Sequence, residues 1–535
     1  RSMDYLSEEA IRALRLLGDD KTTRVFTSEG PEQEYFILDA DAYEKRKDLV
    51  YTGRTLFGAV SPKGQEREDH YFGPIRQKII SFRQEVNENL WVLGIPAKTE
   101  HNEVAPSQHE LATVFAQTNI AADQNERVRL VLKKIAKKHG FICLLGEKPF
   151  NGVNGSGKHN NWSINTDTGV NLFRPGDNPK ENKMFLVFLT AVIKAVDEFG
   201  GLLRCSVATY GNDFRLGANE APPAILSVFL GDELEEVVES IVADKKDKKG
   251  KETSKLLTGA KSLPVLSKDT TDRNRTSPFA YTGNRFEFRM VGSEQNIATP
   301  NTVLNTITGF ALKDFADTVG KAKDKEKAIN DWIRENLKKH QRIIFNGDGY
   351  SASWVKEAEK RGLPNLKTTV EATDVLSDKK VIDLFTSSKV LSKTEISSRA
   401  NIKYDRYANQ ALIDAKTRSH RAHKQYLPSV NSFLAKMARE VKDRKESGLS
   451  VPKTTLNTIN EVSVLLDQAG EVLKKLDSLI EKAKAYHGRE LAVYCRDNLL
   501  DTRKSLREPI DALELSVGKN DWPVPSYGDL LFHII

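Results

Sequence analysis

The chain has 535 residues, enough for several domains. Apolar residues make up 39% and charged residues 29%, the ordinary balance of a globular protein with a sizeable core. The net charge of +7, from 81 basic and 74 acidic residues, is mild and spread out, which argues against a nucleic-acid binder. Three scattered cysteines, short apolar runs and the lack of a signal-peptide pattern predict a cytoplasmic protein, or one of an organelle, with no membrane partner.

The first half of the chain predicts an α+β fold with many strands. An amphipathic helix is expected from Tyr5 to Leu17, with Ser7 as its N-cap. A strand is expected from Glu32 to Leu38, and short apolar runs then alternate with loops up to about Gly292. The Lys- and Asp-rich stretch Asp244–Lys251 predicts a solvated loop. Further helices are predicted at Arg127–His139, Asn182–Phe199, Thr302–Val319 and Lys325–His340.

The last third of the chain predicts long helices. Residues Asn401 to Ser447 are rich in arginine, lysine and alanine. After a break at Pro452, apolar residues recur at helical spacing from Ile459 to Ile480. We therefore expect a helical hairpin whose apolar stripe serves core or subunit contacts.

Two carboxylates lie two residues apart at the start of the predicted strand. Because residues i and i+2 of a strand face the same side, Glu32 and Glu34 would repel each other unless water or a cation lies between them. Mg²⁺ and Mn²⁺ prefer such oxygen ligands. Exposed strands often carry two acids, so this pair alone is a weak signal.

A second acidic pair, Glu103 and Glu110, would point to opposite faces of a regular strand. Pro106 cannot donate to a ladder, so it predicts a break that lets both carboxylates reach one site. His101 and His109 lie nearby, but their spacing is not that of a zinc protease. The alternative is a polar loop with acids placed by chance.

The stretch from Gly152 to His159 nearly matches a phosphate-binding P-loop. His159 stands where that motif needs Ser or Thr, and a strand-like run follows instead of a helix, so we reject the P-loop interpretation. A glycine-rich turn that leads into a strand is the better explanation. His159, Asn161 and Ser163 would then share one face of that strand.

Three later stretches carry arginines, which suit recognition of carboxylate and phosphate. In Asn284–Arg289 the charged residues alternate with two phenylalanines, so a charged face would line a cavity while the rings pack. An exposed strand with an internal salt bridge is the alternative. The residues singled out are Arg215 and Glu220, then Arg275, then Arg285, Glu287 and Arg289.

Taken in order, these segments resemble the glutamine synthetases, and their sequences are most similar to the type III class. The stretches that carry the resemblance are GPEQEYF (30–36), HNEVAPSQHE (101–110), GVNGSGKHNNWS (152–163), RLGANEAPPA (215–224), NRFEFR (284–289) and FNGDGYSASWVKEAEKRGLPN (345–365). The resemblance implies an α+β domain of the glutamine synthetase/guanido kinase kind, with a curved antiparallel half-barrel sheet flanked by helices and a helical C-terminal extension. It also implies a linker helix over 1–23, a catalytic domain over 24–400 with an insert around 240–270, and a helical region over 401–535.

The resemblance implies a site with ATP and two divalent cations, Mg²⁺ or Mn²⁺. The first cation would be held by Glu34, Glu103 and Glu110, and the second by Glu32, His159 and Glu287. Glutamate would bind to Asn154, Gly155, Arg215 and Arg289, and ATP to Arg275, Arg285, Asn161 and Ser163. The catalytic groups would be Arg275 and Arg289, which stabilise transferred charge, and Glu220, which would take a proton from ammonium on a mobile flap.

The implied reaction joins ammonia to L-glutamate in nitrogen assimilation, through a γ-glutamyl phosphate formed from ATP. The family forms large rings, so a homo-oligomer is expected, a dodecamer of two hexameric rings. Two alternatives remain open: a related ligase that uses a larger amine, and a catalytically silent structural subunit.

Two departures from the family pattern set further expectations. The commoner classes carry a second arginine five residues after the one matching Arg275, where this chain has Ala280. The chain also starts after the position of the family's small N-terminal β-rich domain, which completes a neighbouring subunit's active site. We therefore expect weak or no activity from the chain as given.

Overall fold

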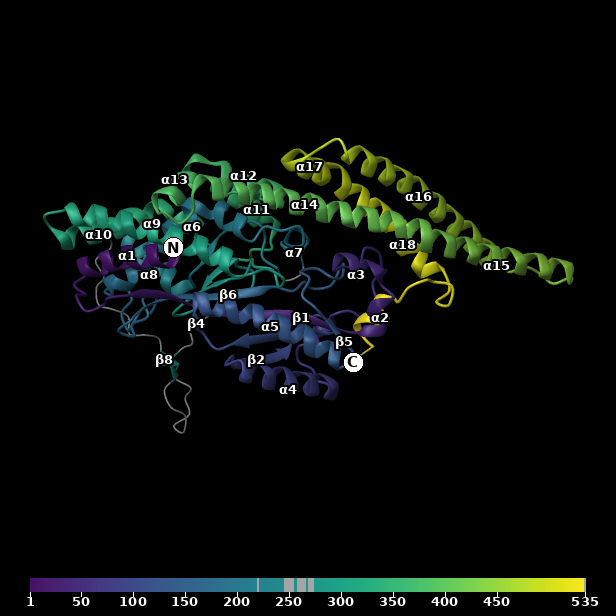
Figure 1. Ribbon diagram of the computed structural model, residues 1–535, viewed down its shortest axis with the longest axis horizontal. Helices are drawn as coiled ribbons and strands as arrows, with labels where there is room; N and C mark the ends of the chain where they lie inside the picture. The colour runs from purple at the N-terminus through teal and green to yellow at the C-terminus, as the bar shows by residue number, and fades with distance from the viewer. Residues whose placement is uncertain (219–220, 245–254, 257–265, 268–273, 534–535) are drawn as a thin grey trace.

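The computed structural model describes residues 1–218, 221–244, 255–256, 266–267 and 274–533. Glu220, most of the predicted loop Asp244–Lys251 and most of the predicted insert around 240–270 lie outside the described residues. The described part combines an open sheet with layers of helices and a long helical extension (Figure 1).

The sheet is built around one long strand, β1 (Val25–Asp39), which contains the predicted run Glu32–Leu38. Its strand order is β2-β3-β1-β6-β11-β10-β7, with β4 and β5 also paired to β1. The pairs are antiparallel except β10 with β7, and the sheet does not close. The expected α+β fold on an open, mainly antiparallel sheet is thus confirmed. The other strands are β2 (Ala97–Asn102), β3 (Gln108–Thr113), β4 (Ala116–Gln117), β5 (Phe141–Leu144), β6 (Lys158–Thr166), β7 (Val228–Phe229), β10 (Phe279–Tyr281) and β11 (Phe286–Phe288).

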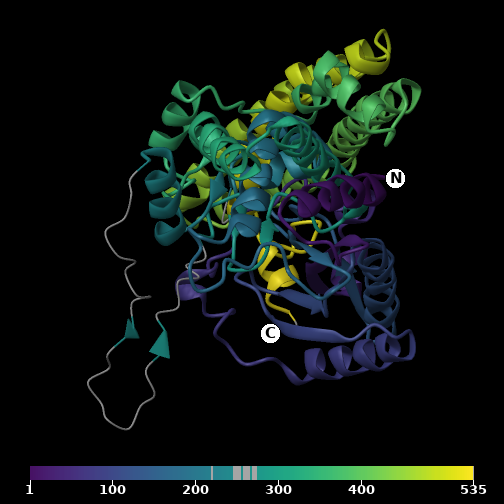
Figure 2. The same ribbon diagram turned by 90° about the vertical axis from the view of Figure 1, so that its left-hand side faces the viewer.

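Alternation along β1 separates a helix-covered face from an open one. Tyr35 and Ile37 pack with Phe82 and Leu132, from α4 (Gln77–Val92) and α5 (Thr118–Lys138), and Figure 2 shows these helices beside the sheet. Glu32 and Glu34 alternate with that apolar set, so they point to the opposite face. The fold therefore places both carboxylates where helices do not cover the sheet.

Helix α1 (Ser2–Leu16) packs closely on α9 (Ala298–Lys321), where a Cβ added to Gly309 would lie 2.9 Å from the Tyr5 ring. The prediction that Ser7 caps this helix is wrong, because the helix already starts at Ser2. The Ser7 hydroxyl instead accepts a hydrogen bond from the Val25 amide, 3.0 Å away. It thus ties α1 to the start of β1.

The remaining predicted helices are present, and all but one have shifted ends. They are α5, α6 (Lys183–Ser206), α9 and α10 (Lys325–His340), and only α10 has the predicted bounds. The others extend further because burial by neighbouring elements continues past the strongest part of the sequence pattern. Among the helices of the described residues, none is both long enough and apolar enough to cross a bilayer.

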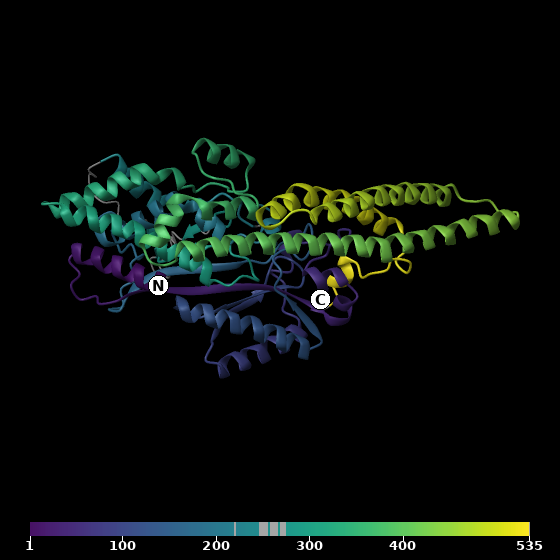
Figure 3. The ribbon, with the colours of Figure 1, turned by 45° about the horizontal axis from the view of Figure 1, so that its top comes forward.

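The predicted helical hairpin is confirmed. Helix α14 (Lys393–Arg421) continues through a π-helical turn into α15 (Leu427–Glu446), and α16 (Lys453–Ala483) returns beside it, after Pro452. Figure 3 shows this rod leaving the body of the molecule. Because α14 runs across residue 400, the predicted boundary between 400 and 401 does not coincide with the end of an element. The division into domains stays a prediction.

A buried ion cluster holds α14 against the body. Asp48, in α3 (Lys47–Thr52), lies 2.6 Å from Arg46 Nη2 and 3.0 Å from Arg421 Nη1. All three side chains are almost fully buried. Burial would raise the pKa of Asp48, but the two arginines outweigh it and lower that pKa to about 2. The carboxylate is therefore charged in the folded chain, and it links two regions far apart in sequence.

The short helix α19 (Tyr527–Leu531) returns to the sheet and contacts two loops. The Tyr527 hydroxyl accepts a hydrogen bond from the Asn151 amide at 3.0 Å, and Ser107 Oγ donates to Leu531 O at 2.7 Å. A Cβ at Gly58 would lie 2.3 Å from the Tyr527 ring, so only glycine fits there. The end of the chain thus fixes the loops before β3 and β6.

Candidate active site

The open face of the sheet forms the wall of a cavity of about 390 Å³. Strand register places acidic and histidine side chains in rows across this wall. Glu34 pairs with Glu110, which pairs with His101, and Glu32 pairs with His159 on the other side of β1. Because cross-strand partners point to the same side, these groups converge. Glu32 and Glu34 share one face as predicted, and the acidic and histidine groups on that face come from four strands, β1, β2, β3 and β6.

The acidic groups gather around two histidines. His159 Nδ1 lies 3.0 Å from Glu32 Oε2 and 3.2 Å from Glu287 Oε1. His101 Nε2 lies 2.9 Å from Glu103 Oε1 and 3.6 Å from Glu110 Oε1. Within the described residues, two sets have ligand atoms within 4.8 Å of one another, Glu32 with Glu110 and His159, and His101 with Glu103 and Glu110.

Crowded carboxylates perturb one another. Burial raises the pKa of Glu110 well above its ordinary value, and Glu32 and Glu103 raise it further. Burial and Glu103 likewise raise the pKa of Glu34. Burial disfavours the charged form of His159, yet its contacts with Glu287 and Glu32 raise its pKa well above the usual range. Since carboxylates and imidazole are ligands of Mg²⁺ and Mn²⁺, this donor set fits divalent cations that would relieve the repulsion.

The predicted break at Pro106 is present between β2 and β3. The chain turns at Ser107, whose φ is +62°, and the Glu103 amide donates to Gln108 O at 2.9 Å. This tight turn brings Glu103 to the same side as Glu110. His109 points away and is hydrogen-bonded to Arg83 and Asn102, so it takes no part in the cavity.

The glycine-rich turn before β6 is compressed against its neighbours. A Cβ at Gly155 would lie 2.4 Å from Glu147 O, and one at Gly157 would lie 2.2 Å from Arg215 Nη2. Asn154 is clamped by Gln65, whose amide nitrogen donates to Asn154 Oδ1 at 2.9 Å. The turn leads into a strand, as expected, and not into a phosphate-binding helix.

The arginines are fixed by carbonyls and carboxylates. Arg215 is 3% exposed, and its guanidinium donates to Val291 O and Arg289 O at 3.3 and 3.2 Å. Arg289 Nη2 donates to Glu287 Oε2 at 3.1 Å. Burial would raise the pKa of Glu287, but Arg289 and His159 together lower it. Glu287 therefore stays ionised between the positively charged side chains of Arg289 and His159.

Strand β11 alternates as predicted. Phe286 and Phe288 are fully buried, while the charged side chains on either side of them line the cavity. Arg285 lies 5.2 Å from the centre of the Phe115 ring and Arg275 lies 5.9 Å from that of Tyr71. The alternative of an exposed strand with an internal salt bridge is half right. The Glu287–Arg289 pair exists, but the strand is buried.

Most predicted site residues meet in this cavity. Ser163 does not line it: its hydroxyl donates to Asn284 O at 3.1 Å. Glu220 lies outside the described residues. Those that line the cavity are Glu32, Glu34, Glu103, Glu110, Asn154, Gly155, His159, Asn161, Arg215, Arg275, Arg285, Glu287 and Arg289.

Several residues around the cavity were not predicted. His101 and Gln108 line it, and the Gln108 amide donates to Gly155 O at 2.9 Å. Both belong to the HNEVAPSQHE stretch, so its polar composition was an available signal. Tyr71 and Lys98 also line the cavity, and Gln65 holds Asn154, yet no local pattern marks these three.

Comparison with known families and proteins agrees with this geometry. Residues 10–227 match the model described as "Glutamine synthetase, catalytic domain", and residues 328–445 match "Glutamine synthetase C-terminal domain". The glutamine synthetase of Butyrivibrio fibrisolvens is 44% identical over 100% of this chain and 76% of its own length. That of Bacteroides fragilis (strain YCH46) is 40% identical over 96% of this chain and 72% of its own length. The chain belongs to the glutamine synthetase family.

Within the family, the similarity points to the predicted class. The "Type-3 glutamine synthetase" of Dictyostelium discoideum is 43% identical over 99% of this chain and 74% of its own length. A solved structure described as "Apo GmaS without ligand" covers 75% of this chain and 73% of its own at 17% identity, and its TM-score of 0.44 is too low to support an argument. Membership implies ATP-dependent formation of glutamine from glutamate and ammonia, with a divalent metal.

Proposed function

We propose that this chain is a glutamate–ammonia ligase that works through a γ-glutamyl phosphate in nitrogen assimilation. One observation supports this most directly. A single cavity joins the carboxylate and histidine rows of β1, β3 and β6 to the arginines beside β11. Phosphoryl transfer to a carboxylate needs this combination, because both partners are anions that repel each other until cations neutralise them.

Two divalent cations, Mg²⁺ or Mn²⁺, fit the donor set. The first would be held by Glu34, Glu103 and Glu110, and the second by Glu32, His159 and Glu287. His159 already contacts Glu32 and Glu287, which makes these three a natural set. Bound cations would neutralise phosphate oxygens and the glutamate carboxylate.

The first step forms the acyl phosphate. Asn154, Gly155 and Arg215 hold glutamate, because the clamped asparagine and the buried guanidinium present fixed donors at one end of the cavity. An oxygen of the γ-carboxylate attacks the γ-phosphorus of ATP, and ADP leaves. Arg275 and Arg289 stabilise the charge that spreads over the transferred group.

The second step makes the amide bond. Ammonia attacks the carbonyl carbon of the acyl phosphate and phosphate leaves, after ammonium has given up one proton. We assign that proton to Glu220, on sequence grounds alone. ATP contacts are assigned to Arg275, Arg285, Asn161 and Ser163. Ser163 is the weakest of these assignments, because its hydroxyl is engaged behind the cavity.

We further propose a homo-oligomer, a dodecamer of two hexameric rings, in the cytoplasm or an organelle. The proposed division is a linker helix over 1–23, a catalytic domain over 24–400 and a helical region over 401–535. The mass of the purified assembly in solution tests the first proposal, and limited proteolysis tests the second.

The decisive experiment measures phosphate release from ATP with Mg²⁺, glutamate and either ammonium or larger amines, on the protein in its natural assembly. Release that needs both glutamate and ammonium, and is lost in Glu287→Gln, supports the proposal. Glu88→Gln, an exposed change on α4, should leave activity unchanged. Release only with a larger amine, or none from a folded assembly that binds Mg²⁺, would overturn it.

A further inference from the structure

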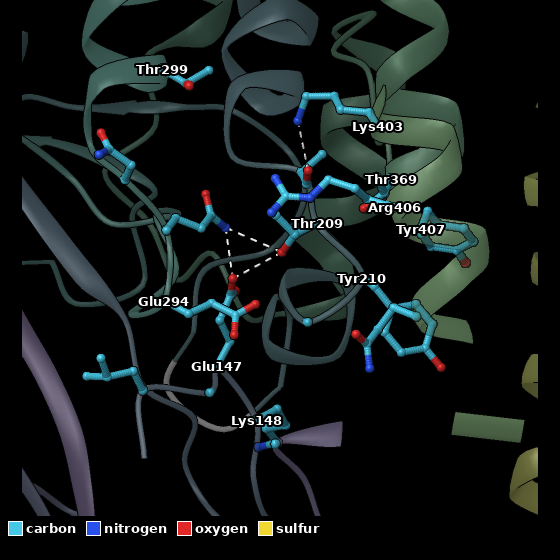
Figure 4. A pocket seen from close by; sticks show the side chains of 18 of the residues that line it. Glu147, Lys148, Thr209, Tyr210, Glu294, Thr299, Thr369, Lys403, Arg406 and Tyr407 are labelled. Carbon is cyan, nitrogen blue, oxygen red and sulfur yellow. Dashed lines mark hydrogen bonds between the residues drawn. The ribbon is translucent and has the colours of Figure 1, made fainter. Parts of the chain in front are cut away.

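A second and larger cavity lies behind the active site. This rear cleft, of about 1350 Å³, is bounded by α5, α14, the loop Gly146–Lys148 and the segment Ser206–Phe214. Figure 4 shows its interior, where Arg406 of α14 reaches toward Thr209 and the Lys403 ammonium donates to Ala208 O at 2.9 Å. Among the described residues, none lines both this cleft and the active-site cavity.

Two helices present basic stripes to the rear cleft. Arg129, Lys133 and Lys137 follow one another at intervals of four on α5, so they lie on one face of that helix. Arg399, Lys403 and Arg406 follow at intervals of four and three on α14, so they too share one face. The described lining holds eight lysines and arginines but only three glutamates. The stripes face each other, because Arg129, Lys133 and Arg406 all act electrostatically on Glu294.

Four of the six stripe cations form neither a close ion pair nor a hydrogen bond within the described residues. Lys133, Lys137, Arg399 and Arg406 are exposed and form no hydrogen bond or ion pair with another described residue. Two of the three lining glutamates are already engaged by protein groups. Glu126 pairs with Arg129 at 2.7 Å, while the Glu147 carboxylate accepts hydrogen bonds from Thr209, Asn212 and Gln295 at 2.8 to 3.0 Å. The cleft therefore carries an uncompensated positive charge inside a concave wall.

We propose that the rear cleft is an effector site for a small polyanion that carries several phosphate groups. Arginine and lysine are the side chains that bind phosphate best, and two opposed stripes can contact phosphates from both sides. The volume is ample for a molecule of nucleotide size. Clefts lined by one sign of charge also concentrate ligands of the opposite sign, and salt weakens this attraction.

A shared wall couples this cleft to the proposed glutamate site. The loop 146–155 presents Glu147 and Lys148 to the cleft and Asn154 to the active-site cavity. The Lys148 ammonium donates to Val153 O, next to Asn154, and Glu147 O accepts from the Ser156 amide at 2.9 Å. Burial and the nearby charge of Arg215 together lower the pKa of Lys148 to about 8. A phosphate that draws Lys148 toward the cleft would therefore release Val153 and shift Asn154.

The proposed effect of the ligand, a changed KM for glutamate, rests on the proposed function. Binding itself can be tested without turnover. Isothermal titration calorimetry with inorganic triphosphate is performed on the natural assembly, while a non-hydrolysable ATP analogue and Mg²⁺ fill the active-site cavity. The double variant Lys133→Glu/Arg406→Glu reverses one charge on each stripe. The matched control, Lys134→Glu/Lys416→Glu, reverses exposed charges on the same helices outside the cleft.

We expect triphosphate to bind the unaltered protein and the control equally, and the double variant at least about tenfold more weakly. Triphosphate should change the glutamate KM of the unaltered protein and of the control but not of the double variant. Absence of binding, equal binding by all three proteins, or binding of citrate in place of triphosphate would overturn the proposal. A change in assembly size in the double variant, without triphosphate binding, would instead assign the cleft to an acidic segment of another copy. Because calorimetry needs no activity, an inactive protein that binds triphosphate would contradict only the proposed function.

Discussion

Replacing Gly157 by alanine tests whether Arg215 holds substrate, without removing any functional group. The added Cβ would lie 2.2 Å from Arg215 Nη2, whereas an ordinary contact begins at 3.4 Å, so the nitrogen must retreat by about 1.2 Å. The guanidinium is 3% exposed and is held by two carbonyls at 3.2 and 3.3 Å. A retreat of this size breaks at least one of those hydrogen bonds and moves the charge from its position.

Loss of one such charge-assisted contact with glutamate costs about 2 kcal/mol, which corresponds to a roughly 30-fold higher KM for glutamate. The KM for ATP should change much less, since the arginines beside β11 stay in place. Steady-state phosphate release measures both constants. Gly211→Ala is the matched control, because its nearest neighbour would be 3.6 Å away. A glutamate KM within threefold of the unaltered value, in a variant that folds, would refute the assignment of Arg215.

Buried and clustered charges lead to three more expectations. Burial raises the pKa of Glu29 well above its ordinary value of 4.5, so the folded chain keeps a proton that the unfolded chain loses, and stability falls as the pH rises through that value. Glu29→Gln should therefore raise Tm above that of the unaltered protein at about pH 8 but not at about pH 4. A variant whose Tm equals that of the unaltered protein at both pH values would contradict this reasoning. Asp48→Asn should lower the free energy of unfolding by about 3 kcal/mol in urea at neutral pH, because it leaves two buried arginines short of a partner. The stability that the Asp48 carboxylate contributes is present above pH 3.8 and is lost as the pH falls toward about 2. If Asp48→Asn and the unaltered protein lost stability equally on acidification, this reasoning would be refuted. Mg²⁺ at 100 times its Kd should stabilise the fold by about 2.7 kcal/mol and so raise Tm. This rise in Tm should disappear in Glu110→Gln and persist in the control Glu88→Gln. An unchanged rise in Glu110→Gln would exclude Glu110 as a ligand.

The sequence predicted the part of the site that depends on local alternation. Glu32 and Glu34 had to share a face once their strand was recognised, and Glu287 had to oppose its flanking phenylalanines. Pro106 marked the turn that brings Glu103 beside Glu110. In each case the signal is local, a period of two residues or a proline that breaks it, so no distant contact was needed.

The missed features depend on contacts between distant segments. Gln65 clamps Asn154 across 89 residues, and nothing near Gln65 distinguishes it from a solvent-exposed glutamine. The cap at Ser7 was misplaced because Ser, a good N-cap in isolation, is used here to bind the Val25 amide. Ser163 shares the strand pattern of His159, but a hydrogen bond to the neighbouring chain segment keeps its hydroxyl behind the cavity.

The return of α19 to the sheet affects how the protein is made. Tyr527 and Leu531 contact the two loops that carry Asn154 and Glu103, while the sheet between those loops consists of strands from the first 288 residues. During synthesis the sheet can pair long before these contacts exist, because more than 200 further residues must leave the ribosome first. The acidic face of the sheet can therefore form before α19 has been made, and a nascent or clipped chain that lacks α19 would hold its acidic loops without these contacts.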